Sequence, residues 1–156
     1  MKIRFATLED IPTFVELGRT FQANTRFKDY PYSPERVAEN IKGAIEDQRG
    51  IYCPLVAVDS TGKPVGGLLG KIERHFFSEQ IVASVIQYNV LPEKRMTGAG
   101  LKMLTAFKQW AENRGAVELA VGINSGTNLK QLDRFLRKLG FQMTGGNYSM
   151  GLGREI

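Results

Sequence analysis

The order of the predicted elements indicates an α+β domain of mixed α/β character, in the order βααβββαβαββ. Two observations support this fold class. Short β-rich runs alternate with stretches whose apolar residues recur at the helical period of 3.6 residues. The longest β-rich run, residues 81–90, is followed by a basic loop with two glycines and then by a helix. The 156 residues contain no internal repeat, linker or low-complexity tract, so we expect one domain over residues 1–156.

The first third of the chain predicts one strand and two helices. Lys2–Ala6 has the pattern of a short strand, and Thr7–Asp10 has the pattern of a capping box that opens a helix. A loop rich in aromatic residues, Asn24–Tyr32, separates this helix from a second one. The second helix begins at Ser33–Pro34, with Ser33 as its cap and Pro34 at its first position.

The middle of the chain predicts a hairpin and a long strand. Leu55–Val58 and Val65–Ile72 are the two arms of the hairpin, and glycines at 66, 67 and 70 occupy the second arm. Because glycine weakens a strand, its repetition predicts a bulge or a close approach of another chain segment to the backbone. Ile81–Val90 follows as the long strand, and Pro92 ends it because proline has no N–H for a ladder.

The last third predicts two helices and three strands. A helix over about Gly98–Arg114 precedes a short strand, Val117–Ile123, and a last helix covers residues 129–139. Phe141 is expected to begin a closing strand. Thr144–Asn147 has the composition of a hairpin turn, and Tyr148–Leu152 is its second arm.

The loop between residues 90 and 101 has the chemistry of an anion site. The first N–H groups of a helix lack intrahelical partners, and the helix dipole places partial positive charge there. Gly98 and Gly100 leave the backbone open to a phosphate, and Arg95 adds a full positive charge. We therefore expect a cofactor that carries a pyrophosphate.

Two common phosphate loops do not fit. A P-loop requires glycine at position 65 and Ser or Thr at position 72, where this chain has Val65 and Ile72. The dinucleotide fingerprint requires a third glycine where Met103 stands. The pattern that remains is Arg95-x-x-Gly98-x-Gly100.

Composition limits the class of protein. The chain is 42% hydrophobic and 24% charged, as is common for globular proteins, and no apolar run has the length of a membrane span or signal peptide. The single cysteine, Cys53, excludes an intrachain disulfide and a multi-cysteine zinc site. We therefore expect no metal, and we expect the protein in the reducing cytoplasm.

The net charge of +5 is unevenly distributed. Residues 91–140 contain nine Lys and Arg against four Asp and Glu, whereas the rest of the chain balances at twelve against twelve. This excess beside the anion loop suits a polyanionic cofactor and also nucleic acid.

Four stretches in order resemble the GNAT superfamily of N-acetyltransferases. Val90-x-Pro92-x-x-Arg95-x-x-Gly98-x-Gly100 resembles its acetyl-CoA loop, and Phe135–Phe141 resembles its last helix running into a Gly-Phe strand start. Ile3–Pro12 and Val56–Gly67 are similar to its opening strand and helix and to its second hairpin. The resemblance covers nearly the whole chain and extends to GNAT-like reading frames of tailed phages. It implies a central mixed, mostly antiparallel sheet with helices on both faces.

The resemblance also implies an activity. Acetyl-CoA would be the co-substrate, bound where the fourth and fifth strands part, and a primary amine would take the acetyl group without an acyl-enzyme. A backbone N–H near Val90 would stabilise the oxyanion. The acceptor is a small-molecule or protein amine, and a homodimer is compatible because dimers are common among members. The expected cofactor-binding residues are Val90, Leu91, Arg95, Met96, Thr97, Gly98, Ala99, Gly100, Leu101, Asn124 and Asn128, the last two having a turn role as an alternative.

The catalytic residues depart from the family pattern. Leu136 stands where the family often has a tyrosine acid, and the strand 81–90 has no carboxylate base. Catalytic residues are therefore unknown, with Tyr88, Tyr148 and His75 as candidates. We expect the acceptor wall in the loops Phe21–Tyr32 and His75–Glu79.

Two alternatives remain open. The first is a catalytically inactive GNAT-like binding or interaction protein that retains CoA binding, which the missing acid and base favour. The second, less supported, is a nucleic-acid binder that uses one basic helical face. That face carries no interleaved aromatic residues. It consists of Lys130, Arg134, Arg137 and Lys138.

Overall fold

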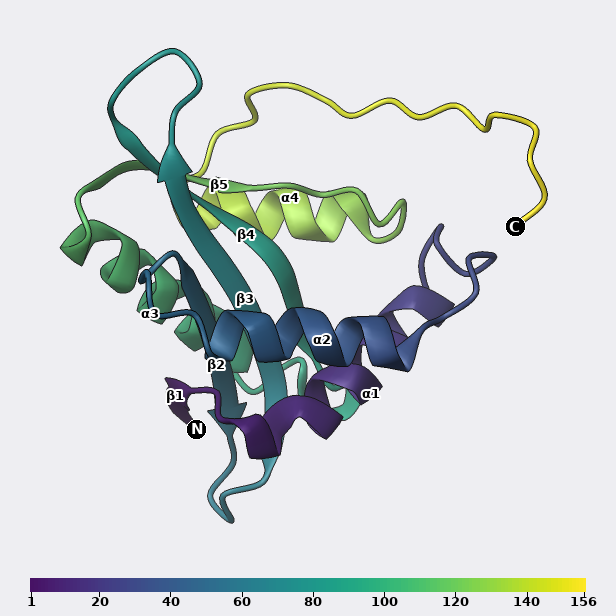
Figure 1. Cartoon of the computed structure of the whole chain (residues 1–156), viewed down its shortest axis with the longest axis horizontal. Helices are drawn as coiled ribbons and strands as arrows, with labels where there is room; N and C mark the ends of the chain where they lie inside the picture. Colours follow the sequence, from purple (N-terminus) through teal and green to yellow (C-terminus); the bar gives the residue numbers. More distant parts are fainter.

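The computed structural model describes all residues, Met1–Ile156, as one α+β domain (Figure 1). Its sheet has five strands in the spatial order β1-β2-β3-β4-β5. Neighbouring strands pair antiparallel except β4 and β5, which pair parallel. The mixed, mostly antiparallel sheet predicted from the resemblance is confirmed. The strands are β1 (Lys2–Phe5), β2 (Tyr52–Val58), β3 (Pro64–Arg74), β4 (Ile81–Val90) and β5 (Ala116–Val121).

The helices cover both faces of the sheet. Figure 1 shows α1 and α2 across one face, and α3 lies on the other. Each of the four predicted helices is present, and the two with predicted bounds, about 98–114 and 129–139, agree with α3 and α4 within one residue at each end. They are α1 (Ile11–Ala23), α2 (Pro34–Ile45), α3 (Ala99–Asn113) and α4 (Leu129–Lys138), with short 3-10 turns η1 (Leu8–Asp10) and η2 (Pro92–Lys94) before α1 and α3.

Strand β2 is buried on both faces, and its successive side chains point alternately into two separate hydrophobic clusters. Leu55 and Ala57 face the cluster beneath α3, whereas Val56 and Val58 face the cluster beneath α1 and α2. This strand begins earlier than predicted and includes Pro54. The missing N–H is tolerated because the ladder with β1 ends at the Phe5–Leu55 pair, so Pro54 lies beyond it.

The glycines of β3 let the helices approach the sheet closely. A side chain at Gly70 would collide with the ring of Phe107 from α3, and one at Gly67 would lie 2.7 Å from the Phe14 ring of α1. Phe107 is fully buried at this contact. The predicted close approach is confirmed. The predicted bulge in this strand is present at Val65, which is the extra residue where Ala57 pairs with Gly66 and Val58 pairs with Pro64.

One partly buried ion pair joins β1 to the start of α1. Arg4 donates to both carboxylate oxygens of Asp10, at 2.8 and 3.0 Å, and the Thr7 backbone N–H donates to the same carboxylate at 2.7 Å. The Asp10 side chain is only 4% exposed. The hydrogen bonds from Arg4 outweigh burial and hold the pKa of Asp10 below its ordinary value.

The chain after α4 differs from the prediction. Phe141 does not begin a strand, Thr144–Asn147 does not form a hairpin turn, and Tyr148–Leu152 is not paired with any segment. A strand forms only against a partner, and glycine at 145, 146, 151 and 153 raises the conformational entropy lost on ordering. The two closing strands were therefore predicted wrongly for the isolated chain, although the fold class is confirmed.

We predict that Gly70→Ala destabilises the protein by about 1–3 kcal/mol, because the methyl group overpacks the Phe107 contact. Gly43→Ala is the matched control. Gly43 lies in α2 with no atom near an added methyl group, so the same change there should stabilise by about 0.5–1 kcal/mol. Chemical denaturation measures both, and equal effects would contradict the prediction.

We predict a pH-dependent cost for Asp10→Asn. A lowered carboxyl pKa contributes stability above the unfolded value of about 3.9, and this contribution is lost as pH falls through the folded pKa. The variant should therefore be less stable than the native protein near neutral pH. The gap in free energy of unfolding should shrink below about pH 4, and a gap independent of pH would contradict the role of Arg4.

Candidate cofactor site

Strand β4 is paired along only part of one edge. Its ladder with β3 runs the whole length, whereas its parallel ladder with β5 ends at the Val85–Val121 pair. A register shift in the ladder with β3 leaves Ile86 as an extra residue at that point. The backbone from Ile86 to Val90 therefore has no partner strand on the β5 side. An open strand edge offers alternating N–H and C=O groups to any extended ligand.

The turn after β4 exposes a set of free backbone donors. Gly98 caps α3 with φ 83°, a left-handed conformation that favours glycine. The first helical hydrogen bond is Lys102 N–H to the Gly98 carbonyl at 3.0 Å. Five N–H groups before it donate to no acceptor in the protein and meet the positive end of the helix dipole. They belong to Met96, Gly98, Ala99, Gly100 and Leu101.

Two other groups of this loop have different surroundings. The Arg95 side chain is exposed and belongs to none of the ion pairs of the protein. The Thr97 hydroxyl donates to the Lys94 carbonyl at 2.6 Å, and its N–H donates to the same carbonyl. Arg95 is thus available to an anion, whereas Thr97 stabilises the turn.

Tyr88 lies between β4 and the first turn of α3. A side chain at Gly100 would collide with the Tyr88 hydroxyl, so glycine is required there for packing as well as for open backbone. The ring contributes to the cluster beneath α3, and burial raises the pKa of Tyr88 to about 12. The hydroxyl has no hydrogen-bond partner and is not a buried unsatisfied group, so it reaches the surface beside Gly100. It remains protonated at neutral pH and is available as a donor.

The other two catalytic candidates lie elsewhere. His75 is exposed in the turn between β3 and β4, where its Nδ1 accepts from the Phe77 N–H at 3.2 Å. This turn precedes Ile81, so the full length of β4, roughly 30 Å, separates it from the cofactor loop. Tyr148 is fully exposed after α4. The structure brings neither side chain to the loop that Tyr88 contacts.

The two asparagines predicted for the cofactor lie in the loop between β5 and α4. Asn128 precedes α4 with φ 54° and is the one non-glycine residue with positive φ, which supports its turn role. The Asn124 carbonyl accepts from Arg26 Nε at 2.6 Å, and the Ser125 carbonyl accepts from the Arg26 N–H.

The Arg26 contacts join the α1–α2 loop to the β5–α4 loop, and no sequence pattern predicted them. Arg26 also stacks over the Phe27 ring at 4.3 Å, and Gln22 donates to the Phe27 carbonyl. The aromatic loop predicted as an acceptor wall is thereby held beside the residues that follow β5, where β4 and β5 cease to pair.

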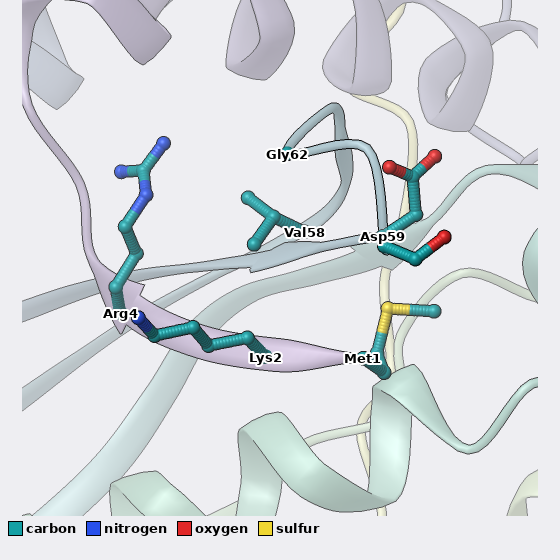
Figure 2. A pocket seen from close by; sticks show the side chains of 7 residues that line it. Met1, Lys2, Arg4, Val58, Asp59 and Gly62 are labelled. Atoms are coloured by element: carbon teal, nitrogen blue, oxygen red, sulfur yellow. The ribbon is translucent and has the colours of Figure 1, made fainter.

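A separate depression of about 450 Å³ lies between β1 and the β2–β3 turn (Figure 2). Arg4 and Asp59 lie on either side of Val58 in this view, and their charged groups do not converge. Both are already engaged, Arg4 with Asp10 and Asp59 with Thr61 and the Lys63 N–H. This depression carries no free converging groups, so the β4–α3 region is the candidate site.

Cys53 has no role in this site. Cys53 is fully buried, and burial raises the pKa of its thiol to about 12. Such a thiol is not nucleophilic at neutral pH.

No helix of the structure combines the length and apolar character that crossing a membrane requires.

Comparison with known proteins agrees with this geometry. The model of the acetyltransferase (GNAT) family matches residues 17–141. No curated protein matches the chain in sequence. Among solved structures, the aminoglycoside antibiotic 6'-N-acetyltransferase AAC(6')-IG from Acinetobacter haemolyticus is 18% identical, with 97% of each chain covered and a TM-score of 0.74.

Two further solved structures are similar. The aminoglycoside acetyltransferase meta-AAC0020 from an uncultured soil metagenomic sample, in complex with sisomicin, is 25% identical over 96% of each chain, with a TM-score of 0.68. A probable acetyltransferase is 20% identical over 99% of this chain and 100% of its own, with a TM-score of 0.76. The chain therefore belongs to the acetyltransferase (GNAT) family, the family of N-acetyltransferases that its sequence predicted.

Proposed function

We propose that this protein transfers an acetyl group from acetyl-CoA directly to a primary amine. The observation that carries the proposal is the junction of β4 and α3. There, an unpaired strand edge runs directly into a turn with five free backbone N–H groups and an unpaired Arg95. Acetyl-CoA supplies the acetyl group as a thioester, and the amine nitrogen takes it up with release of the CoA thiol.

Each part of this junction fits one part of that molecule. The free N–H groups at the start of α3 and the Arg95 guanidinium match a pyrophosphate, which helix N-termini bind well. The open edge of β4 from Ile86 to Val90 matches the amide groups of an extended pantetheine arm, in the manner of an added strand. A β4 N–H near Val90 polarises the thioester carbonyl, as oxyanion donors do in acyl transfer.

The candidate site has few side chains that could accept or donate a proton in the reaction. Strand β4 has no Asp or Glu, so we infer that water takes the amine proton while the protein aligns the reactants. Of the candidates Tyr88, Tyr148 and His75, we favour Tyr88 as a donor toward the bound co-substrate, because its protonated hydroxyl reaches the surface beside Gly100.

The acceptor side lies where the α1–α2 and β5–α4 loops meet. We favour the aromatic loop with Tyr30 over the His75–Glu79 turn as the acceptor wall, because that turn lies at the opposite end of β4 from Val90. Arg26 and Lys28 outnumber Asp29 in this loop, so it offers no acidic surface for a polycation. Monoamines and peptide N-termini therefore head the acceptor panel, with aminoglycosides as the comparison.

A catalytically inactive protein that retains CoA binding is the second candidate. It is favoured by Leu136 at the position where the family often has tyrosine, and by the absence of a carboxylate from β4. Acetyl-CoA binding without acetylation of any amine in the panel would support this candidate. Turnover with one amine would exclude it.

The first prediction concerns the free N–H groups. Acetyl-CoA at about 100 times its dissociation constant adds roughly 2.7 kcal/mol, or a rise of about 5–10 °C in the melting temperature of a domain of this size. Gly98→Glu should abolish this rise, since it places a carboxylate among the donors. Gly115→Glu is the matched control, because Gly115 has a similar φ of 81°, has no atom within 4 Å of an added side chain, and follows α3 at the end opposite to the site. Equal responses of the two variants would contradict the assignment.

The second prediction concerns the Tyr88 hydroxyl. Tyr88→Phe should raise the dissociation constant of acetyl-CoA about three- to tenfold, the usual worth of one neutral hydrogen bond. Tyr32→Phe is the control. Its hydroxyl donates to the Val15 carbonyl within the protein, so its loss should lower stability and leave acetyl-CoA affinity unchanged. Isothermal titration measures the acetyl-CoA affinity of both variants. An unchanged affinity in Tyr88→Phe would mean that the hydroxyl does not contact acetyl-CoA.

The third prediction concerns acceptor choice. Tyr30→Ala should change the order of kcat/KM values across the amine panel while the KM for acetyl-CoA stays constant. Phe77→Ala removes another exposed aromatic ring, at the far end of β4, and should change neither. A changed order in Phe77→Ala alone would instead place the acceptor at the His75–Glu79 turn.

A further inference from the structure

Arg26 is an exposed arginine of the α1–α2 loop whose position is fixed at four points. Its backbone N–H donates to the Ser125 carbonyl at 2.9 Å, and its Nε donates to the Asn124 carbonyl at 2.6 Å. Its guanidinium carbon lies 4.3 Å from the centre of the Phe27 ring. Its aliphatic stem passes so close to Gly126 that a side chain added there would lie 3.2 Å from the Arg26 Cβ. The guanidinium is therefore held in one place.

Most of the hydrogen-bonding capacity of this fixed group is unused. A guanidinium carries five N–H donors, and only the Nε donor of Arg26 has a partner in the protein. Arg26 belongs to none of the ion pairs, and Asp29 in the same loop does not pair with it. The two terminal nitrogens thus present four free donors. Because the side chain is already ordered, a ligand that binds them meets a smaller loss of conformational entropy.

Arg26 lies at the end of the sheet where β4 and β5 part. Val121 is the last β5 residue paired with β4, and its partner Val85 precedes the unpaired part of β4. Asn124, which holds Arg26, follows Val121 by three residues, a span of at most about 11 Å. Figure 1 shows the α1–α2 loop beside the β5–α4 loop on one side of the molecule. The free donors are therefore next to the opening that we assign to the thioester.

The chemistry of these donors selects a carboxylate. The guanidinium is planar, always charged and presents paired N–H groups that match the two oxygens of a carboxylate. Phe27 and Tyr30 lie beside it as an aromatic pair, with ring centres 6.0 Å apart, and offer apolar surface to the rest of a small ligand. The combination suits a small molecule that carries a carboxylate and a modest apolar group.

We propose that Arg26 binds the carboxylate of the acceptor, and that the acceptor is a free amino acid. This inference rests on the proposed acetyl transfer and narrows its acceptor. The amine nitrogen bonds to the acetyl carbon, the thioester C–S bond breaks, and the proton that the amine loses balances the one that the CoA sulfur gains. The products are an N-acetyl amino acid and CoA. An amine without a neighbouring carboxylate, such as a peptide N-terminus, leaves Arg26 without its partner.

Matched pairs of amines test the inference by turnover. Glycine, leucine, phenylalanine and glutamate are each compared with their α-carboxamide, which keeps the amine and removes the α-carboxylate. In at least one pair, kcat/KM should be about ten- to a hundredfold higher for the acid, the usual effect of a hydrogen bond to a charged group. Arg26→Gln should lower kcat/KM for that acid to the value for its carboxamide. The values for the carboxamide and the KM for acetyl-CoA should not change.

The matched control is the same substitution at another exposed arginine. Arg36 lies in α2, outside the aromatic loop, and forms no ion pair. Arg36→Gln removes the same charge and should leave the preference for the acid intact. An equal loss in both variants would assign the preference to net charge and overturn the site. An equal fall for acid and carboxamide in Arg26→Gln would show a structural role only and would also overturn it.

A binding measurement separates this inference from the proposed reaction. Isothermal titration of the same acids and carboxamides is done with CoA in place of acetyl-CoA, so that no acetyl group is transferred. Tighter binding of the acid that is lost in Arg26→Gln would support the site even if no amine were acetylated, and the proposed reaction alone would then fail. Acetylation without preference for the acid in any pair would overturn the site and leave the proposed reaction standing. Equal binding of acid and carboxamide in every pair, without turnover, would overturn both.

Discussion

The parallel pairing of β4 with β5 stops at Val85, and the candidate cofactor site depends on that limit. Up to Val85, β4 is a central strand with a partner strand on each side. Beyond it, β4 has a partner only on the β3 side, and Ile86 marks the change as an extra residue. A strand that is central over one half and an edge over the other half can hold the sheet together and still present backbone to a ligand.

The position of α3 relative to that edge is set by side chains packed against glycine. Phe107 lies over Gly70 and Met103 lies close to Gly66, so α3 can approach β3 only because both sheet positions lack a side chain. At the other end of the contact, Tyr88 of β4 lies against Gly100 of α3. These contacts determine where the free N–H groups of α3 point. The phosphate-binding chemistry inferred for the loop therefore rests on packing deep in the hydrophobic core.

Local patterns predicted the helices and strands as far as Gly140, because the apolar residues of each buried face recur every two residues in a strand or every 3.6 residues in a helix. The capping residue Ser33 predicted the start of α2, Thr7 predicted the 3-10 turn that leads into α1, and Gly98 predicted the start of α3 within one residue. The prediction of two closing strands after α4 failed for a physical reason. Alternation of Tyr148, Met150 and Leu152 expresses a tendency to pair, but a sequence does not say which edge, or which molecule, supplies the partner.

The position of the candidate site could also be predicted from local sequence, but its long-range contacts could not. The anion loop is local, so residues 90–101 are contiguous in the structure as in the sequence, while their contacts with acetyl-CoA remain predictions. The bond between Arg26 and Asn124 joins two irregular loops 98 residues apart, and irregular loops have no period that would reveal such a contact. The catalytic candidates were ambiguous because residue type alone does not show which of Tyr88, Tyr148 and His75 lies near the cofactor loop. The resemblance to tailed-phage sequences also remains a prediction.

The burial of Cys53 has a practical consequence for enzymology. The protonated thiol of Cys53, fully buried near the start of β2, is shielded from disulfide reagents in the folded protein. The CoA thiol released in the proposed reaction can therefore be followed continuously with a chromogenic disulfide, with no background from the folded protein. A burst of colour equal to one thiol per chain would then report loss of the native fold, so the same reagent monitors the integrity of the preparation.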